Sequence, residues 1–548
     1  PRAAGRRTWA RVAGPPLNAA QAAACAAISA AASTFTPFLL DGVTGSGKTE
    51  VYLDAIADVV ARGAQALVLV PEIALTPQTV RRFRERLGFE VALLHSGLSE
   101  GERGRAWLAA AAGDASVVLG TRSAVFVPMA RPGLIVIDEE HDASYKQQDG
   151  FRYHARDLAV VRAKALGVPL VLGSATPSLE SLANAEAGRY RHLRLVERAG
   201  VARPPELHVM DLRHKRVVDG LAIDSLRTIS AHLDAGGQVL VFRNRRGYAP
   251  VLFCHACGWS AQCGRCDRPL TVHRGAARLR CHHCGAEERV PAACPACASP
   301  ALGPQGVGTE RLEAMLAERF PNVPVVRIDR DSTRTRGGRD ALLDGLDAEG
   351  ARILVGTQML AKGHDLSGLT LVVVVGVDEG LYSVDFRAGE RLGQLIVQVA
   401  GRAGRADRPG SVILQTHHPQ HPLLAALLEG GYPMLARRLL AERAAASLPP
   451  FAHLALLRAE AKQNAQTLEF LAAAAAVARA SRLTVLLHGP LPAPMPRRAG
   501  FLRSQLLIEA AERPLMQAFL AAWLPAVRAL PLARRVRWSI DVDPVEMG

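Results

Sequence analysis

The sequence has no apolar run long enough to cross a membrane and no pattern of a secretory signal peptide. A membrane-spanning helix needs about 20 mostly apolar residues, and no uninterrupted apolar run approaches that length. Signal peptides combine a basic start, a short apolar core and a small-residue cleavage site. These absences predict no contact with a membrane, and we expect a cytoplasmic protein.

Cysteines spaced for a disulfide scaffold are also lacking. Only Cys25 lies apart from the other cysteines, in an Ala-rich helical stretch, and it is expected to be a core residue. The remaining eight of the nine cysteines form four C-x2-C pairs within residues 254–297. This spacing indicates metal binding in a reducing compartment and argues against disulfides.

Acidic residues are fewer than basic ones, 51 against 66, which gives a formal net charge of +15. A strongly basic chain favours a polyanionic partner. The arginine bias of an Ala- and Arg-rich genome is the alternative explanation of this charge. With 49% hydrophobic residues the chain can build real cores, and its length predicts roughly three or four domains.

The most informative stretch is DGVTGSGKTE at residues 41–50, which lies between an apolar run and a helix-like segment. It fills every fixed position of the phosphate-binding pattern GxxxxGK(S/T). Glycines let backbone N–H groups surround phosphate oxygens. We expect Lys48 to reach the β- and γ-phosphates of ATP and Thr49 to hold Mg²⁺. The residues predicted to bind the nucleotide in this loop are Gly42, Gly45, Gly47, Lys48 and Thr49.

Short apolar runs recur through the first part of the chain, as in proteins whose buried parallel strands alternate with helices. They cover residues 37–40, 66–71, 91–94, 116–120, 134–137 and 169–172. These runs predict a doubly wound parallel sheet. Asp138 and Glu139 follow one of them directly, at the strand end where open α/β sheets bind ligands. We expect Asp138 to hold Mg²⁺ and Glu139 to accept a proton from the attacking water.

Two other positions in this region are candidates for the nucleotide site. Gln21, about two dozen residues before the phosphate-binding loop, is a candidate for reading the adenine edge, although such a residue alone is more often on the surface. The segment GSATP at residues 173–177 follows the last apolar run. Its small hydroxyl residues are expected to bridge the nucleotide site and a neighbouring domain.

The polar segment 145–156 is basic and interleaved with aromatic residues. That mixture suits single-stranded nucleic acid, whose bases stack on aromatic faces while Arg and Lys neutralise phosphates. The alternative is a loop whose aromatic side chains pack in the core. The predicted DNA contacts are Tyr145, Lys146, Phe151, Arg152, Tyr153 and Arg156.

A strand-like run beginning at residue 237 and two later runs predict a second α/β domain, which contains GRAGR at residues 401–405. Arg402 and Arg405 are three residues apart and so lie on one face of a helix. We expect Arg405, with Arg402 close by, to reach across a cleft to the γ-phosphate as an arginine finger. Taken alone, GRAGR is more often a solvated basic turn.

The four C-x2-C pairs predict two structural zinc sites, because two such turns supply the four thiolates of one tetrahedral Zn²⁺. Spacing alone does not decide which turns share an ion. A nested arrangement is natural, since the inner pairs would cap a hairpin and the flanking pairs would then meet. In that arrangement one ion binds Cys254, Cys257, Cys294 and Cys297, and the other binds Cys263, Cys266, Cys281 and Cys284.

Taken together, these motifs resemble those of superfamily 2 DNA helicases, and in detail those of the PriA family of replication-restart helicases, also called primosomal protein N′. The segments that carry the resemblance are GVTGSGKTE, VPEIALTPQ, GTRSAVF, DEEHDASYKQQDGFRYHARD and GSATPS. The resemblance covers nearly the whole chain and supports the nested zinc pairing. It implies an ATP-dependent 3′-5′ helicase that acts at stalled or branched replication forks and takes part in primosome assembly.

The implied cofactors are ATP, Mg²⁺ and two Zn²⁺ ions. The implied partners are single-stranded and forked DNA, a single-stranded-DNA-binding protein and other primosome proteins, and the chain is expected to be a monomer. Family members normally carry a domain that captures DNA 3′ ends and a winged-helix domain before the motor. Only sixteen residues precede Leu17 here, so we expect these domains to be lost or to lie outside this sequence.

The predicted fold is α/β, with two RecA-like doubly wound parallel-sheet domains, a Cys-rich two-zinc insert and a small α+β C-terminal domain. In the C-terminal domain we expect strands at 504–509 and 535–544, an irregular connection at the Pro-rich residues 489–500, and phosphate contacts or solvated side chains at three arginines, Arg497, Arg498 and Arg503. The expected boundaries are 1–14 for a basic linker, 15–195 for the first motor domain, 196–252 with 301–440 for the second, 253–300 for the insert and 441–548 for the C-terminal domain.

Three other functions are compatible with some of these features. A duplex translocase of the restriction-motor type would share the two motor domains, but the zinc insert and the aromatic segment count against it. An RNA helicase fits GSATPS and the cysteine cluster less well. A DNA-binding assembly platform with a silent ATPase is disfavoured because all the predicted catalytic residues are present.

Overall fold

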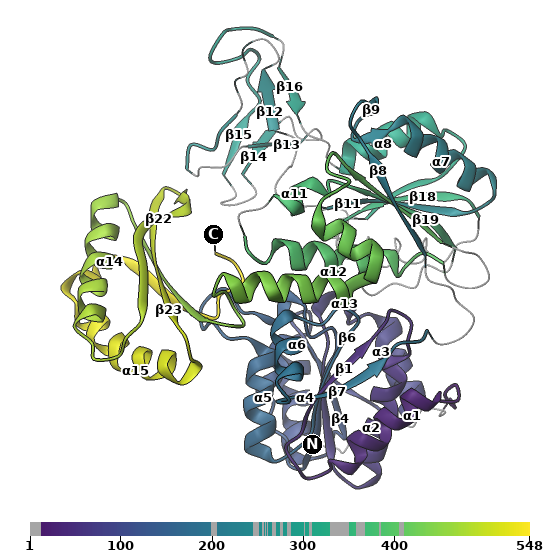
Figure 1. Cartoon of the computed structure of the whole chain (residues 1–548), viewed down its shortest axis with the longest axis vertical. Coiled ribbons are helices and arrows are strands. Elements are labelled where there is room, and N and C mark those ends of the chain that lie inside the picture. The colour runs from purple at the N-terminus through teal and green to yellow at the C-terminus, as the bar shows by residue number, and fades with distance from the viewer. Residues whose placement is uncertain are drawn as a thin grey trace. The chain divides into compact units, whose positions relative to one another are not determined.

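The computed structural model describes residues 12–547 with interruptions. The residues outside the description are 1–11, 199–204, 245–250, 255–256, 258, 260, 266–269, 274–277, 282–285, 301, 306–308, 329–349, 358–367, 383–384, 405–409 and 548. The chain forms two compact units (Figure 1). The first comprises Pro1–Asn244 and Leu316–Leu440, and the second comprises Arg245–Met315 and Ala441–Gly548.

The first unit begins with a seven-stranded sheet in the order β3-β4-β2-β5-β6-β1-β7, and all of its pairings are parallel. Its strands are β1 (Pro37–Gly42), β2 (Gln65–Leu69), β3 (Ala92–Leu94), β4 (Val117–Gly120), β5 (Pro132–Ile137), β6 (Leu170–Ser174) and β7 (Arg191–Leu195). Six of them coincide with the predicted apolar runs. The seventh, β7, is an edge strand in which Arg191, His192 and Arg194 are exposed, and the search for apolar runs does not detect it.

Helices cover both faces of this sheet. They are α1 (Ala19–Ala30), α2 (Lys48–Ala61), α3 (Pro77–Leu87), α4 (Glu100–Ala112), α5 (Ala155–Leu166) and α6 (Leu179–Glu186), with the short 3-10 helices η1 (Glu72–Ala74), η2 (Arg122–Phe126) and η3 (Ala143–Tyr145). Successive strand residues face opposite sides: Phe38 and Leu40 belong to one apolar cluster, and Leu39 belongs to the other. The predicted doubly wound arrangement is therefore confirmed.

A six-stranded parallel sheet in the order β17-β18-β11-β19-β20-β8 forms the second motor domain. Its strands are β8 (Glu206–Asp211), β11 (Gln238–Arg243), β17 (Val325–Ile328), β18 (Arg352–Gly356), β19 (Leu369–Val375) and β20 (Ser411–Thr416). The other described elements are the pair β9 (Val217–Val218) and β10 (Leu221–Ala222), and the helices α7 (Ile223–Asp234), α8 (Thr309–Arg319), α11 (Asp378–Leu381), α12 (Ala388–Ala400) and α13 (Pro422–Ala445).

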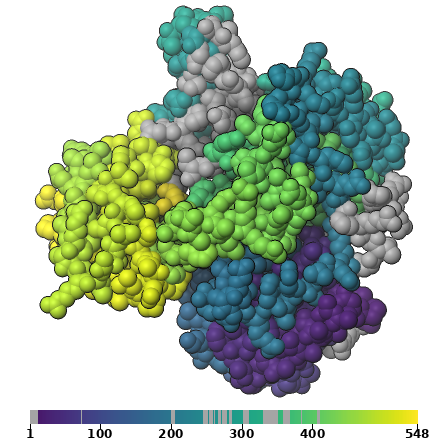
Figure 2. All heavy atoms as spheres, viewed as in Figure 1, coloured from purple at the N-terminus to yellow at the C-terminus, as the bar shows by residue number. Residues whose placement is uncertain are grey.

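The two motor domains touch each other within the first unit. Leu179, the first residue of α6, lies in the apolar cluster built mainly from the second sheet, α12 and α13. The hydroxyl of Tyr432 on α13 donates a hydrogen bond to the carbonyl oxygen of Pro177 at 2.7 Å. In the space-filling view, the green atoms of α13 adjoin the blue atoms of the first domain (Figure 2).

The second unit contains two antiparallel sheets. The Cys-rich insert has the strand order β15-β14-β13-β12-β16, and the C-terminal domain has the order β22-β23-β21-β24. The insert strands are β12 (Val251–Cys254), β13 (Thr271–His273), β14 (Arg278–Arg280), β15 (Glu287–Arg289) and β16 (Leu302–Gln305). The C-terminal elements are β21 (His453–Ala461), α14 (Asn464–Arg479), β22 (Leu486–Arg498), β23 (Phe501–Ala510), α15 (Arg513–Ala529), η5 (Pro531–Arg534) and β24 (Arg537–Val542).

Both predicted C-terminal strands are present, as β23 and β24, but the prediction of an irregular connection at residues 489–500 was wrong. These residues belong largely to β22, which is an edge strand of the sheet. Proline is compatible with an edge strand because one side of that strand needs no N–H donors. The pairing with β23 shifts register between His488 and Leu491 and again between Pro492 and Arg497. Among the described residues, no helix combines the length and apolar character needed to span a bilayer.

Candidate nucleotide and zinc sites

The phosphate-binding loop connects β1, which ends at Gly42, to α2, which begins at Lys48. Gly45 and Gly47 have φ angles of 80° and 79°, in the left-handed region that glycine adopts without strain. Within the part of the chain that the structure describes, a side chain at Gly45 would meet no atom within 4 Å, and the buried Oγ atom of Ser46 has no hydrogen-bond partner. An open backbone cradle and an unsatisfied hydroxyl fit an oxygen-rich ligand such as a triphosphate.

Lys48 and Gln21 both hold this loop. The ammonium group of Lys48 donates to the carbonyl oxygen of Gly42 at 2.8 Å. The amide of Gln21 is buried, donates to the carbonyl oxygen of Ser46 at 2.8 Å, and accepts from the backbone N–H of Asn18 at 2.8 Å. Gln21 is therefore a structural support of the loop and not a surface residue, and its contact with adenine remains a prediction.

The acidic pair follows β5 at the same edge of the sheet. The backbone N–H of Asp138 donates a hydrogen bond to the carbonyl oxygen of Leu69 at 2.9 Å. The hydroxyl of Tyr52 donates to Asp138 Oδ1 at 3.0 Å. The pKa of Asp138 is raised to about 6, chiefly by burial and next by the neighbouring carboxylate of Glu139, while the ammonium of Lys48 lowers it. The Lys48 charge thus acts on Asp138, so the loop and the acidic pair form one site.

The donor set at this site fits Mg²⁺. A hydroxyl from Thr49 at the start of α2 and a buried carboxylate from Asp138 are hard oxygen ligands of the kind that Mg²⁺ prefers. A divalent cation would also offset the unfavourable burial of the Asp138 charge. Glu139 Oε2 is buried and accepts no hydrogen bond from the described residues, although His141 Nδ1 lies 3.5 Å away. That oxygen is available to accept a proton.

His141 connects the acidic pair to the second motor domain. Its Nδ1 lies 2.7 Å from Ser174 Oγ, and its Nε2 lies 2.7 Å from Nε2 of Gln398 on α12. Because an amide nitrogen only donates, Nε2 of His141 must accept this bond, which leaves the proton on Nδ1. The Ser174 hydroxyl reaches the second domain only through His141, and the direct contacts of GSATP with that domain are made by the carbonyl oxygens of Thr176 and Pro177. The expectation that its hydroxyl residues bridge the two stays a prediction.

The first residue of the GRAGR segment, Gly401, lies against the phosphate-binding loop. Helix α12 ends at Ala400, and a Cβ atom on Gly401 would lie 2.5 Å from Cγ2 of Thr44. Such a close approach requires glycine at this position. Arg402 is half-buried next to it, whereas Arg405 lies outside the described residues, so its role as an arginine finger remains a prediction.

The structure corrects three of the predicted DNA contacts, because residues 145–156 are only partly exposed. Tyr145 is fully buried with its hydroxyl 2.7 Å from the carbonyl oxygen of Asp138, and Lys146 is 2% exposed. The Arg156 side chain is 11% exposed and pairs with Glu140 at 3.1 Å. These three side chains support the core and do not face a ligand in solution. The local pattern did not reveal this, because burial depends on residues distant in sequence.

The remaining three predicted contacts do reach the surface. Phe151 is 75% exposed and stacks on Tyr153, with 5.8 Å between the ring centroids. Tyr153 in turn meets Phe126 edge to face at 4.9 Å. Arg152 is partly exposed and donates to the carbonyl oxygen of Gln148. An exposed aromatic stack beside a cation suits base stacking. Phe126, which was not among the predicted DNA contacts, also belongs to this stack.

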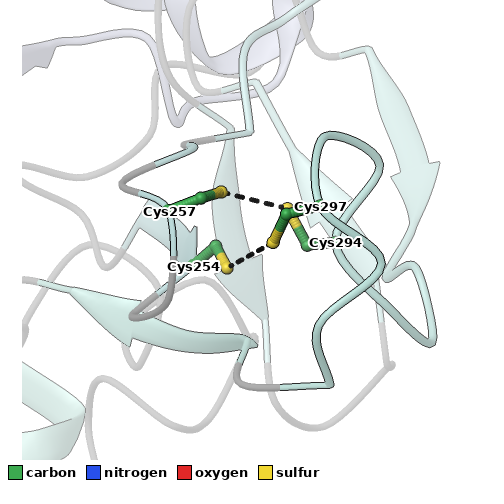
Figure 3. Close-up of side chains that lie close together, drawn as sticks. All are labelled: Cys254, Cys257, Cys294 and Cys297. Carbon is green, nitrogen blue, oxygen red and sulfur yellow. Dashed lines mark hydrogen bonds between the residues drawn. The ribbon is translucent and has the colours of Figure 1, made fainter.

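One of the two predicted zinc sites is assembled in the described part of the insert. Figure 3 shows the four thiols of Cys254, Cys257, Cys294 and Cys297 facing one another. Their sulfur atoms all lie within 4.8 Å, with Cys254 and Cys297 at 3.6 Å and Cys257 and Cys294 at 3.7 Å. Tetrahedral Zn²⁺ with Zn–S bonds of about 2.3 Å sets thiolates about 3.8 Å apart. The outer pairs therefore meet, as the nested arrangement predicted.

The inner pairs are only half described. Cys263 and Cys281 are buried in one apolar cluster with Leu252, Leu270 and Leu279. Cys266 and Cys284 lie outside the described residues. The second zinc ion thus remains a prediction.

Family models for helicases and for primosomal proteins match the chain. A DEAD/DEAH box helicase model matches residues 18–185, and a helicase conserved C-terminal domain model matches residues 307–407. A model of the PriA DNA helicase Cys-rich region matches residues 263–289, and one of the primosomal protein N C-terminal domain matches residues 444–545. Two parallel-sheet domains, a phosphate-binding loop and an adjoining GRAGR segment thus place the chain in the class of ATP-dependent DNA helicases.

Replication restart protein PriA of Haemophilus influenzae is 48% identical over 94% of this chain and 70% of its own length. The Bacillus subtilis protein is 40% identical over 93% of this chain and 64% of its own length. The Synechocystis protein is 41% identical over 97% of this chain and 65% of its own length. The chain belongs to the PriA family of replication restart proteins, and it spans about two thirds of the length of these relatives.

The buried charge of Asp138 predicts a pH-dependent gain in stability for Asp138→Asn. In the folded chain the pKa of Asp138 is about 6, above its ordinary value of 3.8, so folding opposes ionisation of this carboxyl group. The resulting loss of stability grows as the pH rises from about 4 to 6, and it then levels off. We expect Asp138→Asn to raise the free energy of unfolding by about 1–3 kcal/mol at pH 8 and by much less near pH 4.

Melting temperatures of the variant and the parent chain, measured between pH 4 and 8, test this expectation. Asp54→Asn, which changes an exposed carboxylate on α2, is the matched control. If the difference in melting temperature between Asp138→Asn and the parent chain stays constant over this range, the carboxylate of Asp138 is not destabilised by burial, and the account is contradicted.

Zinc content per chain tests the two-site arrangement. Metal analysis of the purified chain should find two Zn²⁺, and Cys254→Ala should lower the content to one, since the inner site keeps all four thiolates. Cys25→Ala, which removes the buried cysteine outside the insert, should leave two. A single zinc ion in the parent chain, or loss of both ions in Cys254→Ala without unfolding of the insert, would contradict separate sites.

Proposed function

We propose that the chain is an ATP-driven 3′-5′ DNA helicase that acts at stalled or branched replication forks during replication restart. The observation that supports this most is that Gly401, directly before Arg402, lies against Thr44 of the phosphate-binding loop. Nucleotide bound by the loop would then be next to residues from both motor domains. The restart role rests on the named function of the family.

The proposed chemistry uses the residues of the nucleotide site. The loop N–H groups and Lys48 bind the phosphates, and Glu139 Oε2 accepts a proton from the attacking water. Thr49 and Asp138 would hold Mg²⁺, which would supply charge stabilisation of the phosphoryl oxygens. Arg402, and Arg405 as the predicted finger, stabilise the charge on the transferring phosphoryl group.

Hydrolysis would be linked to movement through the contacts of His141. The imidazole lies 3.5 Å from the Glu139 carboxylate and 2.7 Å from Gln398 on α12. A change at Glu139 on hydrolysis would alter this bond and with it the position of α12. The two domains would then separate and close again once per ATP.

The nucleic-acid contact is assigned to the exposed aromatic stack. Phe151 and Tyr153 offer ring faces to bases, and Arg152 offers a cation to phosphates. The net charge of +15 favours the same polyanionic partner. We place the motor in residues 15–195, 196–252 and 301–440, with the zinc insert at 253–300, the C-terminal domain at 441–548 and residues 1–14 as a linker.

Single-stranded-DNA-binding protein and other primosome proteins are proposed partners, on the strength of the family's role in restart. We further propose a monomeric chain that uses ATP, Mg²⁺ and two zinc ions. A DNA-binding assembly platform without ATP turnover and a duplex translocase without strand separation are the rival functions. The assembly platform predicts no ATP hydrolysis, and the duplex translocase predicts ATP hydrolysis without unwinding.

Lys48→Ala is the direct test of the proposed ATPase. ATP turnover of the parent chain should rise when single-stranded DNA is added, and the variant should lose about 100-fold or more of that turnover, because the positioned cation at the β- and γ-phosphates is removed.

Lys164→Ala, which removes an exposed lysine at the end of α5, is the matched control and should hydrolyse ATP like the parent chain. If the parent chain binds DNA and hydrolyses no ATP, the helicase proposal fails and the assembly platform is favoured.

A further inference from the structure

Five charged side chains of alternating sign gather at the first turn of α6, between the acidic turn of the first motor domain and α12 of the second. We call this set the charge ladder. It consists of Glu140, Arg156, Glu180, Arg387 and Glu390. None of these residues belongs to the phosphate-binding loop or to the GRAGR segment, and none is needed for the chemistry proposed above.

The ladder begins in the first domain at Glu140, which is 0% exposed. Its carboxylate accepts from the backbone N–H of Ser178 at 2.7 Å and from the hydroxyl of Ser181 at 2.8 Å. Arg156 Nη1 completes this set at 3.1 Å from Glu140 Oε2 and also donates to Ser178 Oγ at 2.7 Å. A buried carboxylate with this many donors is fully compensated, and it fixes the first turn of α6.

The ladder continues into the second domain through α6. Arg387 Nη1 lies 2.6 Å from Glu180 Oε1 and 4.0 Å from Glu390 Oε2. Glu390, which is 4% exposed, also accepts from the backbone N–H of Leu179 at 3.0 Å. The carboxylate of Glu390 in the second motor domain therefore lies at the N-terminus of α6 in the first, where the helix dipole favours a negative charge.

Both arginines of the ladder act at the first turn of α6, where Arg156 donates to Ser178 Oγ and Arg387 pairs with Glu180. Burial lowers the pKa of Arg156, but the carboxylates of Asp157, Glu140 and Glu180 more than offset this and raise it. Burial likewise lowers the pKa of Arg387, and Glu180 and Glu390 raise it. Glu180 thus stabilises a guanidinium in each domain. Removing one partner of such buried pairs leaves an uncompensated charge, which is strongly unfavourable.

The position of the ladder suggests what it connects. Glu140 is two residues from Asp138, and Arg156 is the last residue of the aromatic segment 145–156, which carries the exposed Phe151 and Tyr153. At the other end, α12 carries Glu390 and ends just before GRAGR. A displacement of α12 would move Arg387 and Glu180, and with them the first turn of α6. Through the bond from Arg156 to Ser178 it would reach the aromatic segment.

We propose that the charge ladder couples closure of the two motor domains to the placement of the aromatic segment, with Glu180 and Arg387 as its interdomain step. These are positioning residues that do not touch ATP or DNA. The inference rests on the proposed helicase function for its effect on turnover, but the contact itself does not depend on that function. Loss of the contact between Glu180 and Arg387 should reduce the stimulation of ATP hydrolysis by DNA and leave the rate of hydrolysis without DNA unchanged.

A double-mutant cycle with Glu180→Gln and Arg387→Gln tests the interdomain step. Each single variant should lower DNA-stimulated ATP turnover about tenfold with unchanged basal turnover. The double variant should be no worse than either single one, because both remove the same interaction. Arg387→Lys keeps one charge but cannot serve both carboxylates, so it should restore part of the stimulation. Arg213→Gln, in an exposed pair with Asp211, is the matched control.

Amide hydrogen exchange of residues 178–186, measured without DNA or ATP, gives a readout independent of catalysis. Exchange at Leu179 should be faster in Arg387→Gln, since Glu390 is no longer held at that N–H, and unchanged in Arg213→Gln. Multiplicative losses in the double variant, or unaltered exchange at Leu179, would overturn the ladder. If the parent chain shows no DNA stimulation, the proposed function fails, and the exchange data still decide whether the ladder exists.

Discussion

The hydrogen bond between His141 and Gln398 is the contact on which the arrangement of the nucleotide site depends. It joins the acidic turn after β5 to the helix that ends at the GRAGR segment, at a distance of 2.7 Å. Other polar contacts between the domains accompany it, including Gln394 with the carbonyl oxygen of Thr176 and Tyr432 with that of Pro177. Each such bond contributes only about 0.5–1.5 kcal/mol. A set of weak contacts can hold the domains together in one nucleotide state and release them in another.

The nucleotide site contrasts with these contacts because it is built at the expense of stability. A carboxyl group is held in the sheet edge at Asp138 with its pKa raised to about 6 by burial and by Glu139. Ser46 Oγ and Glu139 Oε2 are buried without hydrogen bonds among the described residues. Unsatisfied groups of this kind are rare in folded chains and mark places where a ligand completes the set. These destabilising buried groups are thus concentrated where phosphate, metal and water are proposed to bind.

Much of the fold was predictable because its determinants are local. Six strands of the first sheet follow from short apolar runs, and the phosphate-binding loop follows from glycines that the turn requires, with φ near 80° at Gly45 and Gly47. The meeting of the outer C-x2-C pairs, shown by the sulfur positions, followed from their nested spacing. The features that the sequence analysis predicted wrongly or missed depend on residues that are distant in sequence. Tyr145, Lys146 and Arg156 look like nucleic-acid contacts in sequence but are buried, and Gln398 pairs with His141 across 257 positions of sequence.

Strand separation by the intact chain is the most direct test of the claim that domain closure over ATP drives a helicase. Two partial duplexes, one with a 3′ and one with a 5′ single-stranded arm, would be incubated with the chain, ATP and Mg²⁺. The account predicts ATP-dependent displacement from the duplex with the 3′ arm only, and none by Glu139→Gln, whose side chain no longer accepts the proton from water. Hydrolysis of ATP without displacement from either duplex, or displacement only from the duplex with the 5′ arm, would contradict it.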